Sequence, residues 1–220
     1  MEYLIKYSAL ILAFLIAIIG HEIMHGLVAK YYGDDTASRA GRLSINPLKH
    51  IDPFGSVIFP ILLYVSQKIA GVENPIIFGW AKPVPVNIFK VIENGGYLAA
   101  VAVSLAGITY NLVVAIIAAS VIDFFYPPHS IFSLFLFLFF YYLVVVNVIL
   151  AVFNALPIPP LDGANALKYL ALHFKLNEIA KFYNKIEQYG MLILLIILFT
   201  PLADYIFIPA QKLISWLLSF

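Results

Sequence analysis

The chain of 220 residues contains no cysteine and little charge. Without cysteine there can be no disulfide and no thiolate ligand, so a metal site would have to use His, Asp or Glu. Charged residues make up 11% of the sequence, whereas soluble domains carry about 25%. The net charge of +1 gives no reason to expect nucleic acid as a partner. These absences exclude a typical soluble domain and direct attention to the apolar residues.

Long apolar runs dominate the sequence: hydrophobic residues make up 63% of it and the mean hydropathy is +0.95. A membrane-spanning helix needs about 20 apolar residues. The candidate spans are 3–29, 53–70, 97–123, 130–155 and 187–207. We therefore predict an all-α polytopic protein of a cell membrane, with about five to six transmembrane helices in contact with the lipid bilayer. We expect one domain over residues 1–220, with a core at about 10–170 and a C-terminal span and interfacial helix over 187–220.

The distribution of Lys and Arg predicts the orientation of these spans. Segments 30–52 and 162–186 are rich in Lys and Arg, whereas 124–129 has neither, so the first two should face the cytoplasm. The N-terminus would then lie outside, and the chain between Lys49 and Tyr97 must cross the membrane an even number of times. Either 53–70 forms a hairpin, or 74–87 returns as re-entrant extended chain. We expect the extended return, because the prolines of 74–87 forbid a regular helix.

The stretch IAIIGHEIMHGLVAK, residues 16–30, places three ionisable residues at the end of the first apolar run. Such groups are costly at membrane depth and are usually functional there. His21 and His25 are four residues apart and share one face of a helix, with Glu22 beside them. H-E-x-x-H is the arrangement of zinc proteases in which the glutamate is the general base. The alternative is a polar helix end at the interface with Glu22 capped or paired, and the pentapeptide alone does not decide between them.

A further carboxylate follows the fourth apolar run in FNALPIPPLDG, residues 153–163. The prolines end the helix, so Asp162 would lie in irregular chain and could be aimed into the bundle. The simpler interpretation of Asp162 alone is a turn aspartate followed by Gly163.

Taken together, these segments resemble the site-2 protease family of intramembrane zinc metalloproteases. HEIMHG is similar to its zinc-binding helix, and Asn154–Gly163 to its second signature, N-x-x-P-x-P-x-L-D-G. SLAGITYN resembles the central-helix motif, with Gly107-Ile108 where Gly-Pro is usual, and Ala164 stands where a second glycine is common. GRLSINPLKHIDPFG and FGWAKPVPVN resemble the short branch without regulatory domains. The resemblance covers about residues 10–170.

The resemblance implies a zinc metalloendopeptidase that cleaves transmembrane protein substrates and binds one Zn²⁺ per chain. It implies zinc ligation by His21, His25 and Asp162, with Glu22 as general base. It places Asn154, Pro157 and Pro159 in contact with the unwound substrate and Asn111 in the active-site region. We expect the extended segment to lie beside the zinc and to bind substrate by strand addition. The oligomeric state stays open.

Two other functions were weighed against proteolysis. A metal transporter would distribute polar residues across the membrane depth, whereas here they gather in two motifs beside a general-base glutamate. A membrane zinc protease for prenylated or other peptides usually has a downstream helical glutamate or further histidines, and that pattern is missing. For Asn147 we expect interhelical hydrogen bonding, and for His50 and Asp52 a polar pair in a loop rather than metal ligation.

Overall fold

The computed structural model describes residues 2–73 and 79–219. Within them all regular elements are helical, which confirms the predicted all-α class. The α-helices are α1 (Glu2–Tyr31), α2 (Thr36–Arg39), α3 (Phe59–Ile69), α4 (Ile88–Ile122), α5 (Ile131–Asn154), α6 (Asp162–His173), α7 (Asn177–Glu187), α8 (Gly190–Leu198) and α9 (Leu202–Leu217). Shorter turns are the 3₁₀-helices η1 (Pro47–Lys49) and η3 (Asp123–Phe125) and the π-helix η2 (Pro53–Ile58).

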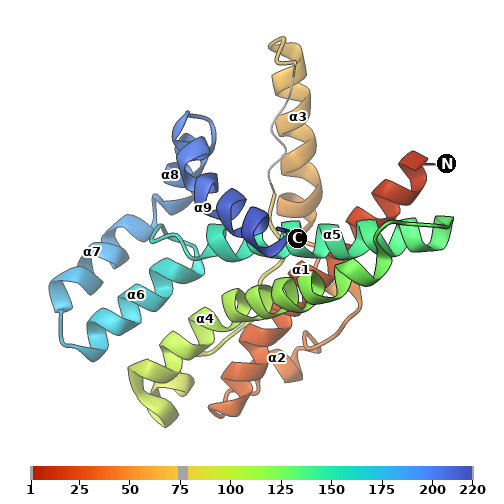
Figure 1. Ribbon diagram of the computed structural model, residues 1–220. Coiled ribbons are helices and arrows are strands. Elements are labelled where there is room, and N and C mark those ends of the chain that lie inside the picture. Colours follow the sequence, from red (N-terminus) through yellow and green to blue (C-terminus); the bar gives the residue numbers. More distant parts are fainter. Residues whose placement is uncertain (1, 74–78, 220) are drawn as a thin grey trace.

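Helices α1, α4 and α5 pack against one another and form the centre of the fold (Figure 1). Alanines line this interface, including Ala13, Ala115 and Ala118, while large apolar side chains such as Ile11 and Ile116 point outward and are exposed. Small residues between helices and large apolar residues outside are typical of packing in a bilayer, where lipid covers the outer surface. The arrangement agrees with a membrane protein.

Three helices of the described chain are long and apolar enough to span a membrane, and a fourth would be added if α8 and α9 form one bent span. The three are α1, α4 extended by η3, and α5, which confirms helices at the predicted spans 3–29, 97–123 and 130–155. Gly96, whose φ is 69°, interrupts α4 directly before the predicted span 97–123. This backbone conformation suits glycine because a Cβ would be strained there.

The other two predicted spans have different structures, so the structure does not confirm the expected five to six transmembrane helices. The first, 53–70, is an apolar helix over Pro53–Ile69 that is shorter than the three spans. Its α3 part has no buried residue and projects away from the central helices (Figure 1). The second, 187–207, breaks into α8 and α9 with an 82° bend. A proline disfavours helical backbone at the residue before it, and here Pro201 directly precedes α9.

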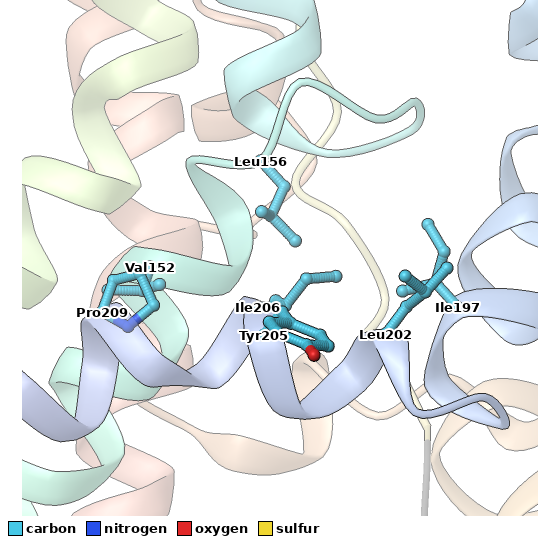
Figure 2. A pocket seen from close by; sticks show the side chains of 7 residues that line it. All are labelled: Val152, Leu156, Ile197, Leu202, Tyr205, Ile206 and Pro209. Carbon is cyan, nitrogen blue, oxygen red and sulfur yellow. The ribbon is translucent and has the colours of Figure 1, made fainter.

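The bend between α8 and α9 borders an apolar cavity of about 420 Å³. Figure 2 shows its lining side chains, which come from the end of α5, from Leu156 just beyond it, from α8 and from α9. All of them are apolar except for the hydroxyl group of Tyr205. The cavity thus offers no chemistry of its own, and the functional residues lie elsewhere.

Two features of the C-terminal third are set by single residues. The lysine-rich segment 164–186 is not one surface helix but two, α6 and α7, because the chain reverses at Lys175, where φ is 60°. Pro209 does not begin the last helix but lies inside α9. The start of α9 is instead set by the break at Pro201, and Pro209 removes one backbone donor inside the helix.

Candidate metal centre

The structure brings His21, His25 and Asp162 together although the last two are 137 positions apart in the sequence (162 − 25). The ligand atoms of these three side chains lie within 4.8 Å of one another. Oδ2 of Asp162 is 3.1 Å from Nε2 of His21 and 3.3 Å from Nε2 of His25, and the two Nε2 atoms are 3.1 Å apart. The cluster therefore joins α1 to the first residue of α6.

Asp162 reaches the cluster because α6 begins pressed against the end of α5. A Cβ added at Gly163 would lie 2.3 Å from the carbonyl oxygen of Ala155, so only glycine permits this approach. Asp162 and Gly163 are thus the first two residues of a helix rather than an ordinary turn. Both the turn and the irregular chain expected at Asp162 are wrong, because Gly163 allows α6 to begin in close contact with the end of α5.

The orientation of the His25 ring is set by a backbone carbonyl group. Nδ1 of His25 lies 2.7 Å from the carbonyl oxygen of Val103 on α4. A carbonyl oxygen can only accept a hydrogen bond, so Nδ1 carries the proton. In the neutral ring Nε2 is then an unprotonated acceptor that faces the cluster.

The orientation of the His21 ring is set by two buried asparagines. Nδ2 of Asn111 donates to the carbonyl oxygen of Ala17 at 3.1 Å and to Oδ1 of Asn147 at 2.8 Å, and Asn147 donates to the carbonyl oxygen of Leu143. This leaves Oδ1 of Asn111 to accept from Nδ1 of His21 at 2.7 Å. Both asparagines are fully buried. The predicted interhelical role of Asn147 is confirmed, and Asn111 lies behind the ring, which favours a positioning role over substrate contact.

These contacts point three electron-rich atoms at one another. Both Nε2 atoms lack a proton in the neutral rings, and the buried Oδ2 of Asp162 has no hydrogen-bond partner among the described residues. Such atoms repel one another unless a cation lies between them. A tetrahedral zinc ion with bonds of about 2.0–2.1 Å would hold its ligands about 3.3–3.4 Å apart, close to the distances found here. The donor set therefore fits zinc.

The ring of His21 also depends on a glycine of α4. A Cβ added at Gly107 would lie 2.4 Å from Cε1 and 2.5 Å from both ring nitrogens of His21. Gly107 thus provides the space in which the ring lies. Its place in the SLAGITYN motif could have indicated this role, whereas nothing in the sequence singles out the carbonyl group of Val103.

Glu22 lies next to the cluster and is held by the extended segment. Its Oε2 accepts a hydrogen bond of 2.8 Å from the backbone N–H of Val84. Among the described residues Glu22 has no other hydrogen-bond partner, so one carboxylate oxygen is left for a small molecule. The predicted closeness of the extended segment to the cluster is therefore confirmed at Val84.

Comparison with known proteins agrees with this geometry. A 209-residue match, 34% identical, relates 91% of this chain to 84% of the Bacillus subtilis protein named "Putative zinc metalloprotease YwhC". This chain belongs to the site-2 protease family, peptidase family M50. The model of Peptidase family M50 matches residues 129–198 of the protease. A protein of Mycolicibacterium smegmatis named "Putative zinc metalloprotease Rip2" is 30% identical over 222 residues, covering 100% of this chain and 76% of the relative. No solved structure matches.

The predicted re-entrant segment is described from Gly79 onward, and its residues 74–78 lie outside the described part of the chain. Residues 79–87 form no regular element. The N–H groups of Trp80 and Lys82 donate to the carbonyl groups of Gly55 and His50 at 3.1 and 2.9 Å. Their carbonyl groups accept from Ser56 and Arg42, respectively, at 2.8 and 2.7 Å. The main-chain groups of Trp80 and Lys82 thus hydrogen-bond the rest of the protein along one edge of the segment.

The opposite edge of this segment is open and has few donors. Ala81, Pro83 and Pro85 alternate with the bonded residues, and in extended chain their carbonyl groups point the other way. Among the described residues no protein group hydrogen-bonds these three carbonyl groups. Both prolines lack an N–H, so hydrogen-bond acceptors dominate this edge. These unpaired carbonyl groups are compatible with the predicted strand addition, which stays a prediction.

The remaining predicted residues take varied positions. The side chain of Asn154 donates to the carbonyl oxygen of Leu150 at 3.0 Å within α5, Pro157 is exposed and Pro159 is buried; their contact with substrate stays a prediction. His50 and Asp52 do not pair with each other as expected. Asp52 instead accepts from the N–H of Gly55 at the start of η2, because its own backbone is extended there.

Proposed function

We propose that this zinc metalloprotease hydrolyses peptide bonds in or near transmembrane segments of other membrane proteins. His21, His25 and Asp162 would hold a single zinc ion. The observation that carries the proposal is the convergence of three unprotonated ligand atoms beside Glu22 on a helix that is apolar enough to span a membrane. When bound, zinc supplies a Lewis acid that polarises the scissile carbonyl group and makes water nucleophilic at neutral pH.

Glu22 serves as the general base in this proposal. The N–H of Val84 holds one carboxylate oxygen and thereby fixes the direction of the other. The other oxygen takes a proton from the attacking water and delivers it to the leaving amine. Glu22 is adjacent to His21 in the sequence, so the base and the two histidines share helix α1, while Asp162 reaches them from α6.

The open edge of residues 81–85 binds the substrate backbone. A transmembrane helix must unwind before cleavage, and its freed N–H groups then need acceptors. The carbonyl groups of Ala81, Pro83 and Pro85 supply acceptors, as in strand addition. Because the prolines have no N–H, substrate carbonyl groups opposite them find no donor on this edge.

In this proposal residues 79–87 lie at membrane depth, where the N–H of Val84 meets Glu22 beside the metal centre. The chain has no cysteine of its own, so single cysteines from 79 to 88 can be labelled in intact membranes with an impermeant thiol reagent. We expect protection across residues 80–86. Uniform labelling of residues 79–88 from one side would rule out the re-entrant strand.

The experiment that tests the function uses the detergent-purified protease, its zinc content and a transmembrane peptide as substrate. Glu22→Gln should keep the zinc and lower the cleavage rate by about 10²–10⁴-fold, the contribution of general-base catalysis. Glu93→Gln, an exposed glutamate of α4, is the control and should cleave normally. Full activity of zinc-loaded Glu22→Gln would refute the mechanism, and a zinc-loaded wild type that cleaves no transmembrane peptide would refute the substrate class.

A further inference from the structure

A cavity of about 700 Å³ lies beside the metal centre. Its walls include Phe14 and Ile18 of α1, Ile149 and Phe153 of α5, and Trp80 of the extended segment. Ile18 lies three and four residues before His21 and Glu22 on the same helix, so the cavity begins about one turn from the chemistry. Its volume falls in the range of ligand pockets, about 300–1,000 Å³.

His50 is a buried polar residue in the wall of this cavity, with an exposed fraction of 3%. Its Nε2 lies 2.7 Å from the carbonyl oxygen of Ser44 and must therefore carry the proton. In the neutral ring Nδ1 is then an acceptor. Nδ1 is buried and has no hydrogen-bond partner among the described residues. A buried acceptor without a hydrogen-bond partner destabilises the folded protein by about 1–3 kcal/mol. We therefore expect a hydrogen-bond donor to bind Nδ1.

The other side chains of the cavity give no comparable polar contact. The hydroxyl group of Ser56 already donates to the carbonyl oxygen of Trp80 and accepts from the N–H of Asp52. Most of the remaining wall is aliphatic or aromatic. An occupant of this cavity should therefore be apolar and carry a hydrogen-bond donor that meets His50.

We propose that Nδ1 of His50 accepts a hydrogen bond from a main-chain N–H of the unwound substrate. The inference rests on the proposed function, because an unwinding transmembrane segment combines apolar side chains with newly freed N–H groups. The backbone of His50 supports this placement, since its carbonyl group binds the N–H of Lys82 and joins it to the substrate-binding segment. His50 thus makes a substrate contact that the open edge of residues 81–85 does not provide.

Two substitutions separate this contact from the structural role of the ring. In His50→Gln the amide nitrogen falls near the position of Nε2 and can still donate to Ser44, but the acceptor at the Nδ1 position is lost. In His50→Asn the amide oxygen falls at the Nδ1 position and keeps the acceptor, but the tie to Ser44 is lost. We expect His50→Gln to raise KM about 3–10-fold with kcat within about twofold, the effect of one neutral hydrogen bond. We expect His50→Asn to keep a normal KM and to lower the thermal unfolding midpoint.

The decisive measurement removes the donor from the substrate. Transmembrane peptides with single ester replacements, each lacking one N–H outside the scissile bond, are cleaved by wild type and by His50→Gln, with zinc content measured for both. We expect one ester position to raise the KM of wild type and to leave the KM of His50→Gln unchanged. Esters that affect both enzymes equally at every position would overturn the inference, as would a normal KM for His50→Gln. Failure of wild type to cleave any peptide would instead count against the proposed function.

Discussion

On one side of His21 and His25, helices α4 and α5 meet α1 through buried alanines and a continuous chain of hydrogen bonds from Leu143 to His21. On the other side, α3 has no buried residue, and residues 79–87 contact the rest through a few main-chain bonds. The first side fixes ligand rings, which must not move if metal geometry is to be kept. The second side leaves backbone groups and a cavity free, as a protease needs if a substrate strand is to enter. Substitutions on the first side should therefore change zinc binding, whereas those on the second should change substrate handling or stability alone.

Among the substitutions that test this comparison, Asp162→Ala should have the largest effect on zinc binding and cleavage. Loss of the carboxylate leaves two histidines, fewer than the three protein ligands of a catalytic zinc site. We expect zinc to be lost on dialysis and cleavage to become undetectable, as measured by elemental analysis and peptide assay. Asp123→Ala, at an exposed site in η3, is the matched control. A fully zinc-loaded Asp162→Ala protein would show that Asp162 is not a ligand.

Gly107→Ala should come next, because it adds one methyl group to the rigid side. The new Cβ would lie 2.4 Å from Cε1 of His21, so the ring must leave its position. We expect zinc affinity to fall by about 100-fold or more, beyond the usual effect of a group that orients a ligand. Leu105→Ala, at a partly exposed position of the same helix, should bind zinc normally. Equal zinc affinity in the two variants would mean that α4 adjusts and that this side is less rigid than we infer.

The asparagine pair should have a smaller effect on zinc. Asn111→Leu removes the acceptor that fixes the proton on Nδ1 of His21, and we expect a loss of about 10–100-fold in zinc affinity. Asn147→Leu should lose less, since it acts through Asn111, and the double variant should equal Asn111→Leu. Ser104→Ala removes another buried polar group of α4 whose bond stays within its own helix, and it should be silent. Additive losses would contradict a chain that acts through His21.

The sequence indicated which side chains form the cluster better than it indicated which groups orient them. His21 and His25 were recognisable because their spacing fits one helical face, and the prolines before Asp162 showed that helix α5 had to end. The proton donors and acceptors around them include the carbonyl group of Val103 and the N–H of Val84, and every residue has such groups. Their use depends on which backbone happens to lie nearby, so residue types could not reveal it.

The fold, like the site, could be predicted from the sequence only in part. The three central helices could be predicted from the length of their apolar runs. Each of α1, α4 and α5 satisfies its backbone hydrogen bonds internally, so its formation in a membrane does not depend on neighbouring chain. The break at Pro201 and the position of Pro209 inside α9 depend on which of two prolines ends a helix, and both residues carry the same local signal. Segment 53–70 has the composition of a span, and η2 and α3 fill it as an apolar helix over Pro53–Ile69 that is shorter than the three long helices.

The smallest effect on activity is expected at Asp34, which anchors the end of the extended segment. Asp34 is fully buried between α1 and α2 and accepts from the N–H of Asn87 at 2.6 Å and from Thr36. Burial alone would raise the pKa of Asp34, but the hydrogen bonds from Thr36 and Asn87 and the charge of Lys90 outweigh it and hold the pKa below its ordinary value. The carboxylate therefore stabilises the folded state when it is ionised.

The lowered pKa of Asp34 determines the pH range in which Asp34→Asn should reduce the free energy of unfolding. A group whose pKa is lowered by folding contributes its full stability above its unfolded pKa, about 4, and loses that contribution as the pH falls through the lower folded pKa. We expect Asp34→Asn to lower the free energy of unfolding by about 1–3 kcal/mol at pH 7 and the difference to shrink below about pH 4. Thermal unfolding of the metal-free protein in detergent measures it, with Asp204→Asn at an exposed site of α9 as control. Zinc affinity at pH 7 should be unchanged, because Asn87 lies on the open side and none of the ligand rings touches Asp34; a zinc loss in Asp34→Asn would show that the two sides are coupled through the extended segment.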